Sequence, residues 1–147
     1  MLLHRGWAHS VSGETAEGIA LIEQGIRDYR ATGAVLGLPI FLGRKAEALY
    51  LADRPSEALE AINEAKVLAE RLEHRDYCAR MHCLRGVFLA TLGAEESQIE
   101  ASFAAAIRIA KEQKSVSLEK RAEATYAEYR RQRASGLGEG GFRLPFW

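Results

Sequence analysis

The chain has 147 residues, of which 48% are hydrophobic and 27% charged, and its 20 basic and 20 acidic side chains leave no net charge. This composition is too hydrophobic for an intrinsically disordered chain, and no apolar run approaches the roughly 20 residues of a membrane-spanning helix. The balanced charge argues against a general attraction to nucleic acid or to anionic membranes.

The N-terminal residues and the cysteines indicate the compartment. No basic stretch is followed by an apolar core and a small-residue cleavage site, so we expect a cytoplasmic protein without a signal peptide. The two cysteines, Cys78 and Cys83, are too few for a disulfide scaffold, and their spacing fits no common zinc motif. On a helix they would point about 140° apart, so we expect no bridge between them.

Small residues and turn residues recur along the chain at a nearly constant step. Steps of 40, 40 and 36 residues separate the small residues Gly6, Ala46, Gly86 and Ala122. Steps of 40 separate the turn residues Gly13, Asp53 and Gly93. Later positions are offset by one residue, which places one extra residue in the turn after Gly93. Such a period indicates a tandem array of structural repeats.

Each repeat is predicted to hold two helices. In chain order, Gly13 separates the first pair and Gly33 ends the second helix, Pro39 and Pro55 each open a helix, and Gly93 breaks the third pair. A last helix is expected from about residue 115 to 133. The apolar residues follow a 3- and 4-residue spacing throughout, without strand-like alternation. We therefore expect seven helices in an all-α fold, with breaks near 12–14, 33–37, 53–54, 73–75, 93–95 and 113–115.

The small residues are expected where helices cross closely, with a bulky neighbour filling the adjacent gap. Together with the Gly or Asp turn and the Glu57-Ala58-Leu59 opening of a second helix, this pattern resembles the tetratricopeptide repeat over residues 1–133. The resemblance implies antiparallel helical hairpins stacked as a short right-handed superhelix of about three and a half repeats. The 40-residue period exceeds the usual 34 or so and also suits HEAT-like helix pairs.

Within that family, the 40-residue period and phrases such as Ala16-Glu17-Gly18-Ile19-Ala20 resemble the C-terminal arrays of large bacterial signalling proteins. Those proteins carry an ATPase domain, often with a nucleotide-cyclase or DNA-binding domain. This chain has no Gly-x-x-x-x-Gly-Lys-Ser/Thr loop. The resemblance therefore implies a non-catalytic array, without a cofactor, that is part of a longer protein.

The tetratricopeptide geometry implies a concave groove lined by the first helix of each pair. The groove would hold a peptide or a partner domain, and the alternatives are a small-molecule sensor around Trp7, Tyr50 and Arg44 or a nucleic-acid binder. It is equally open that Trp7 and Tyr50 belong to the core between repeats. The groove-facing residues are expected to be Leu3, Trp7, Ser10, Gly43, Arg44, Glu47, Tyr50, Leu51, Cys83, Val87, Ala90, Thr91, Glu119, Glu123, Tyr126 and Ala127.

Three other features have ordinary structural interpretations. His74, Cys78 and His82 share a four-residue spacing, but a helix beginning after His74 would remove it from a metal site. Residues 108–133 hold eight basic and four acidic side chains, and the interleaved acids favour a solvated face, so we do not expect nucleic acid. The glycines of residues 136–141 follow a helix, unlike a phosphate-binding loop, and indicate a linker.

Residues 134–147 form a Gly-rich tail with an apolar end. The fourth repeat lacks its second helix, so its first helix would leave an apolar stripe uncovered, and solenoid ends need a cover. Phe142, Leu144, Phe146 and Trp147 are predicted to pack as this cap, on their own chain or exchanged with a second copy.

Overall fold

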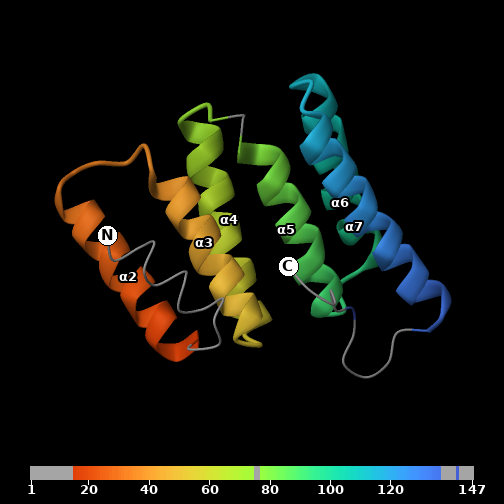
Figure 1. The fold of residues 1–147 in the computed structure, drawn as a ribbon, viewed down its shortest axis with the longest axis horizontal. Helices are drawn as coiled ribbons and strands as arrows, with labels where there is room; N and C mark the ends of the chain where they lie inside the picture. The colour runs from red at the N-terminus through yellow and green to blue at the C-terminus, as the bar shows by residue number, and fades with distance from the viewer. Residues whose placement is uncertain (1–14, 75–76, 137–141, 143–147) are drawn as a thin grey trace. The chain divides into compact units, whose positions relative to one another are not determined.

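The computed structural model describes residues 15–74, 77–136 and 142, and within them every element of regular structure is helical (Figure 1). The helices are α2 (Thr15–Ala31), α3 (Leu38–Leu51), α4 (Pro55–Arg71), α5 (Cys78–Thr91), α6 (Glu96–Glu112) and α7 (Val116–Ala134). The all-α prediction is confirmed, and five of the six expected breaks separate consecutive helices. The helix expected before residue 12 lies outside the described residues.

The helix lengths and positions repeat with the period of the sequence. Helices α3 and α5 have 14 residues each and begin 40 residues apart, whereas α2, α4 and α6 have 17 residues each. The start of α4 lies 40 residues after that of α2, and α6 begins 41 residues after α4. The extra residue predicted after Gly93 therefore lies in the turn between α5 and α6.

The helix ends repeat as well. Asp53 and Gly93, each the second residue after the end of α3 or α5, take the left-handed backbone conformation, with φ of 61° and 72°. The amide of Arg54 then donates to the carbonyl of Leu49, and that of Ala94 to Leu89, at 2.9 and 3.0 Å. These six-residue bonds are those of a Schellman motif, which satisfies carbonyls that a helix end leaves open. The same local geometry thus closes both helices, although only one of them has glycine there.

The chain forms two compact units, one containing α2, α3 and α4 and the other α5, α6 and α7. In the first unit α3 packs against both α2 and α4, and in the second α6 packs against both α5 and α7. Helices packed on their neighbours in sequence, joined by short turns, are helical hairpins. None of the described helices is both long and apolar enough to cross a membrane.

The first unit buries apolar side chains from all three helices, among them Ile22, Leu42 and Ile62. At the connection from α2 to α3, the Tyr29 hydroxyl accepts a hydrogen bond from the amide of Gly37 at 2.9 Å. The Tyr29 ring meets Phe41 edge to face, with ring centres 4.9 Å apart. These contacts of Tyr29 hold the link between α2 and α3 in place. A 40-residue repeat needs a longer link here than a repeat of about 34 residues does.

The core of the second unit is built around Phe103 of α6. A Cβ atom added to Gly86 of α5 would lie 2.9 Å from the ring of Phe103, so only glycine fits without a shift. The ring also packs against Tyr126 and Tyr129 of α7, with ring centres 5.2 and 5.9 Å away. The prediction that Gly86 marks a close helix crossing is confirmed.

Phe142 returns to this core from the C-terminal tail. Its side chain is fully buried and meets Tyr129 edge to face at 5.8 Å between ring centres. The Thr91 hydroxyl lies 2.9 Å from the carbonyl oxygens of both Phe142 and Val87. Its single proton therefore bonds either the tail or its own helix. The other predicted cap residues, Leu144, Phe146 and Trp147, lie outside the described residues.

Candidate functional site

The predicted groove face of the first unit lies on α3. Gly43, Glu47, Tyr50 and Leu51 recur at helical spacing and share one side of the helix. Gly43 and Glu47 are buried and Tyr50 is half-buried, whereas Leu51 is 42% exposed. Arg44, beside this face, is half-buried. Three further predicted groove residues, Leu3, Trp7 and Ser10, lie outside the described residues.

The equivalent face of α5 carries three further predicted groove residues, Cys83, Val87 and Ala90. All three side chains are buried. Helix α7 packs against α5, and Cys83 lines one small hollow together with Leu118 and Ala122 of that helix. The fourth predicted residue of this face, Thr91, is half-buried beside the carbonyl of Phe142.

On α7, the predicted residue Tyr126 takes part in packing within the unit. Its ring stacks on Phe103 with an interplanar angle of 16°. The guanidinium of Arg130 lies 4.1 Å from the Tyr126 ring centre and donates a hydrogen bond to its hydroxyl at 2.8 Å. Glu119 forms an ion pair with Lys111 at 3.8 Å. Glu123 and Ala127, one helical turn apart on α7, are both exposed.

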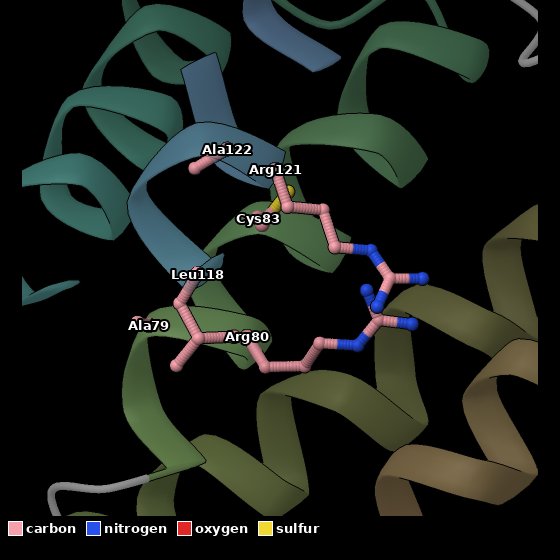
Figure 2. A pocket seen from close by; sticks show the side chains of 6 residues that line it. All are labelled: Ala79, Arg80, Cys83, Leu118, Arg121 and Ala122. Carbon is pink, nitrogen blue, oxygen red and sulfur yellow. The ribbon is translucent and has the colours of Figure 1, made fainter. Parts of the chain in front are cut away.

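A small hollow lies between α5 and α7. Figure 2 shows the six side chains that line it, with the two guanidinium groups next to each other and the Cys83 sulfur near the backbone end of Arg121. Its volume is about 180 Å³ with open solvent included. The lining residues are Ala79, Arg80, Cys83, Leu118, Arg121 and Ala122.

The two arginines of this hollow were not singled out in the sequence. Arg121 counts among the basic residues of 108–133, and its only local signal is its place beside the close-packed Ala122. Arg80 carries no such signal. The two cations share one hollow because α5 packs against α7 and because Arg80 and Arg121 lie at matching positions along the two helices.

Cys83 at the back of the hollow is a neutral thiol at pH 7. Burial raises its pKa, and this effect outweighs the hydrogen bond with Thr125 and the positive charges of Arg80 and Arg121, which act to lower it. Cys83 and Cys78 are both free and buried, so no disulfide joins them, as their spacing predicts. The hollow therefore presents two cations and a neutral sulfur.

His74 lies in the loop before α5, as expected, and not on the helix. The Cys78 thiol donates a hydrogen bond to the backbone carbonyl of His74 at 3.2 Å. Across the described parts of the chain, three or more His, Cys, Asp or Glu side chains nowhere gather closely enough to hold a metal ion.

The basic residues of 108–133 are interleaved with carboxylates, as the sequence suggested. Arg108 lies 3.8 Å from Glu112 and Arg131 lies 2.6 Å from Glu128, both within one helix. Arg133 of α7 lies 2.5 Å from Glu96 of α6 and links the two helices. Such exposed pairs contribute little stability individually, at most about 1 kcal/mol.

Exposed apolar side chains gather at the connection from α2 to α3, a feature that the sequence analysis missed. Leu36 is 65% exposed, and Val35 and Ile40 are also exposed. Leu36 and Ile40 are four residues apart, one in the loop and one in the first turn of α3. On a protein surface, neighbouring apolar side chains of this kind mark a possible contact region.

Comparison with known proteins gives one informative similarity. No family model matches the chain, and no solved structure does. An uncharacterized protein of Rhizobium meliloti (strain 1021) is 33% identical to the chain over 127 residues. The match covers 86% of this chain but spans only 12% of that protein's length. The chain is thus an all-helical domain similar to one segment of a much longer bacterial protein.

Proposed function

We propose that the chain is a non-catalytic protein-interaction module whose hairpins stack as a tetratricopeptide-like right-handed superhelix. The observation that carries this proposal is the recurrence of one hairpin, 14 residues then 17, with the same left-handed closure between its helices. Arrays of identical hairpins create extended surfaces that contact partner chains.

The proposed contact face is that of α3. Tyr50 and Leu51 combine a half-buried aromatic ring with an exposed aliphatic side chain, and Arg44 adds a positive charge beside them. Aromatic and arginine side chains contribute most of the binding energy in many interfaces, because they bury large areas at a small entropic cost. The proposed occupant is a peptide or a neighbouring domain.

We further propose that this module is the regulatory part of a longer signalling protein. The support is the Rhizobium relative, in which the similar segment is a small part of the whole chain. A partner domain within the same polypeptide would meet the module at a high effective concentration, so even a weak contact would suffice.

The test is quantitative affinity capture from lysate of the source organism with the wild type, Leu51→Ser and Tyr50→Ala. Both variants should lose partners that the wild type retains, because they remove the apolar part of the α3 face. The matched control is Val67→Ser on α4, which is 54% exposed but lies outside this face. Equal recovery by the wild type and both α3 variants would refute the interaction face.

A second candidate function is ligand sensing, which the hollow between α5 and α7 favours. In that case the regulatory signal would be the occupancy of this hollow.

A further inference from the structure

The buried side chain of Phe142 comes from the tail and lies outside any helix. Its ring meets Tyr129 of α7 edge to face, with ring centres 5.8 Å apart. Its backbone carbonyl lies 2.9 Å from the hydroxyl of Thr91, the last residue of α5. We call the space that this side chain fills the Phe142 slot. One side of the slot is thus Thr91, a residue predicted to face the groove.

The wall of this slot on α7 is held by contacts that do not involve Phe142. The Tyr129 ring packs against Phe103 of α6, with ring centres 5.9 Å apart. The Tyr129 hydroxyl accepts a hydrogen bond from Arg133 at 3.0 Å, and Arg133 also pairs with Glu96 of α6. A ligand that enters a preformed site loses less free energy to the ordering of that site. The Phe142 slot is preformed in this sense.

The polar contact of the tail can be exchanged without leaving a buried donor unpaired. The Thr91 hydroxyl lies 2.9 Å from the Val87 carbonyl as well as from that of Phe142. A threonine in a helix commonly donates to the carbonyl four residues earlier. When the tail leaves, Thr91 therefore keeps a hydrogen bond to its own helix, and the cost of an unsatisfied group is avoided.

Phe142 is tethered close to the slot by the chain that follows α7. Gly136 ends that helix with φ of 80°, and Phe142 follows six residues later, with glycine at 138, 140 and 141 in between. A ligand on a short linker of this composition reaches an effective concentration on the order of 1 mM. Any other ligand of the slot must compete with the tail at that concentration.

We propose that the Phe142 slot binds an aromatic side chain of a partner peptide, and that Phe142 is its intramolecular competitor. Phe142 itself shows the chemistry of the ligand: a ring for the edge-to-face contact with Tyr129 and a backbone carbonyl that accepts from Thr91. The tail thereby sets the partner concentration at which binding begins. The inference rests on the proposed interaction role but concerns α5 and α7, so it can fail separately from the α3 face.

The test is an NMR titration of the full chain with a capped peptide of residues 138–144, which contains a single aromatic side chain. Phe142→Ala leaves the slot empty, and we expect it to bind the peptide with a dissociation constant on the order of 0.1 mM. The wild type should bind roughly tenfold more weakly, because the tail competes at about 1 mM. The amide signals of Thr91 and Tyr129 should shift. Equal affinity of the two proteins, or no saturable shift in Phe142→Ala, would overturn the proposal.

A second variant keeps Phe142 and therefore the core of the second unit. It carries a 20-residue Gly-Ser insertion after Gly138, which lengthens the tether without changing the slot. The effective concentration of the tail falls as about the −3/2 power of linker length, so this variant should bind the peptide roughly fivefold more tightly than the wild type. The proposal fails if the insertion leaves the affinity unchanged.

Matched peptides test the chemistry of the ligand. A peptide with alanine in place of its phenylalanine should not bind Phe142→Ala, and one with leucine should bind several-fold more weakly than the original. Leucine binding as tight as phenylalanine would overturn the aromatic assignment. Shifts confined to Tyr50 and Leu51 would place the peptide on the α3 face and overturn the slot, whereas failure of the α3 variants in affinity capture would leave the slot supported.

Discussion

The close crossing at Gly86 allows a prediction that separates two opposing effects of one methyl group. In Gly86→Ala the new Cβ would lie 2.9 Å from Cε1 and Cζ of Phe103 and 3.1 Å from Cδ1. Phe103 is fully buried and packs against Tyr126 and Tyr129, so its ring has little room to move away. The substitution must therefore strain the core of the second unit.

The expected magnitude is a balance of two terms. Alanine is favoured over glycine inside a helix by about 1 kcal/mol. Overpacking a filled core costs about 1–3 kcal/mol. We expect Gly86→Ala to lower the free energy of unfolding by roughly 0–2 kcal/mol, as the difference of these terms. Gly86→Leu adds more atoms at the same place and should destabilise the protein more.

The assay is a double-mutant cycle measured by denaturant unfolding. Phe103→Leu removes the ring, so Gly86→Ala in that background should be neutral or stabilising by up to about 1 kcal/mol. The coupling between the two sites should then be about 1–3 kcal/mol. Ala104→Gly, at an exposed position of α6, calibrates the helix-propensity term. The close crossing at Gly86 would be refuted by zero coupling energy together with a Gly86→Ala variant that is more stable than the wild type by the full helix-propensity difference, about 1 kcal/mol.

Three further predictions follow from the second unit. Deletion of residues 136–147, or Phe142→Ala, should lower the free energy of unfolding by about 1.5–3 kcal/mol, the value of burying one such side chain, and should increase binding of a hydrophobic dye. Unchanged stability and dye binding would contradict a capping role of the tail. The pKa of Glu128 is lowered to about 2, and the largest cause is the hydrogen bond that Arg131 donates to its carboxylate. The ionised Glu128 side chain therefore contributes stability above pH 4.5, and this contribution is lost as the pH falls toward 2. NMR titration of the Glu128 carboxyl should show this low midpoint, and a midpoint near 4.5 would exclude the bond in solution. Cys83 is buried with a raised pKa, so a thiol reagent at pH 8 should label it only as the protein unfolds. Rapid labelling of the native protein, followed by mass spectrometry, would contradict its burial.

Much of the fold could be predicted because its signals are local. Apolar spacing identifies the helices, and Pro39 and Pro55 occur in the first turns of α3 and α4, as expected. The period predicted the extra residue after Gly93, which lies in the turn between α5 and α6. At Gly86 the small side chain identified a crossing correctly, since close helix contact requires a missing side chain wherever the partner lies.

The candidate site could be predicted only in part. The tetratricopeptide geometry treats equivalent positions on α3 and α5 alike, yet Leu51 on α3 is exposed, whereas Thr91, 40 residues later on α5, is half-buried beside the carbonyl of Phe142. The periodicity of one helix states which residues share a face but not which helix covers that face. Exposure of Leu36 in the link between α2 and α3 was missed for the same reason.

The sequence by itself determined the helices, their ends and their period, because hydrophobic spacing, proline and left-handed turns act over a few neighbouring residues. Only the tertiary structure decided that Phe142 lies against Tyr129 and that Arg80 and Arg121 share one hollow. These residues are 13 and 41 positions apart, and their contacts depend on how whole helices pack. Packing is selected by the total burial of several faces at once, and no local pattern encodes it.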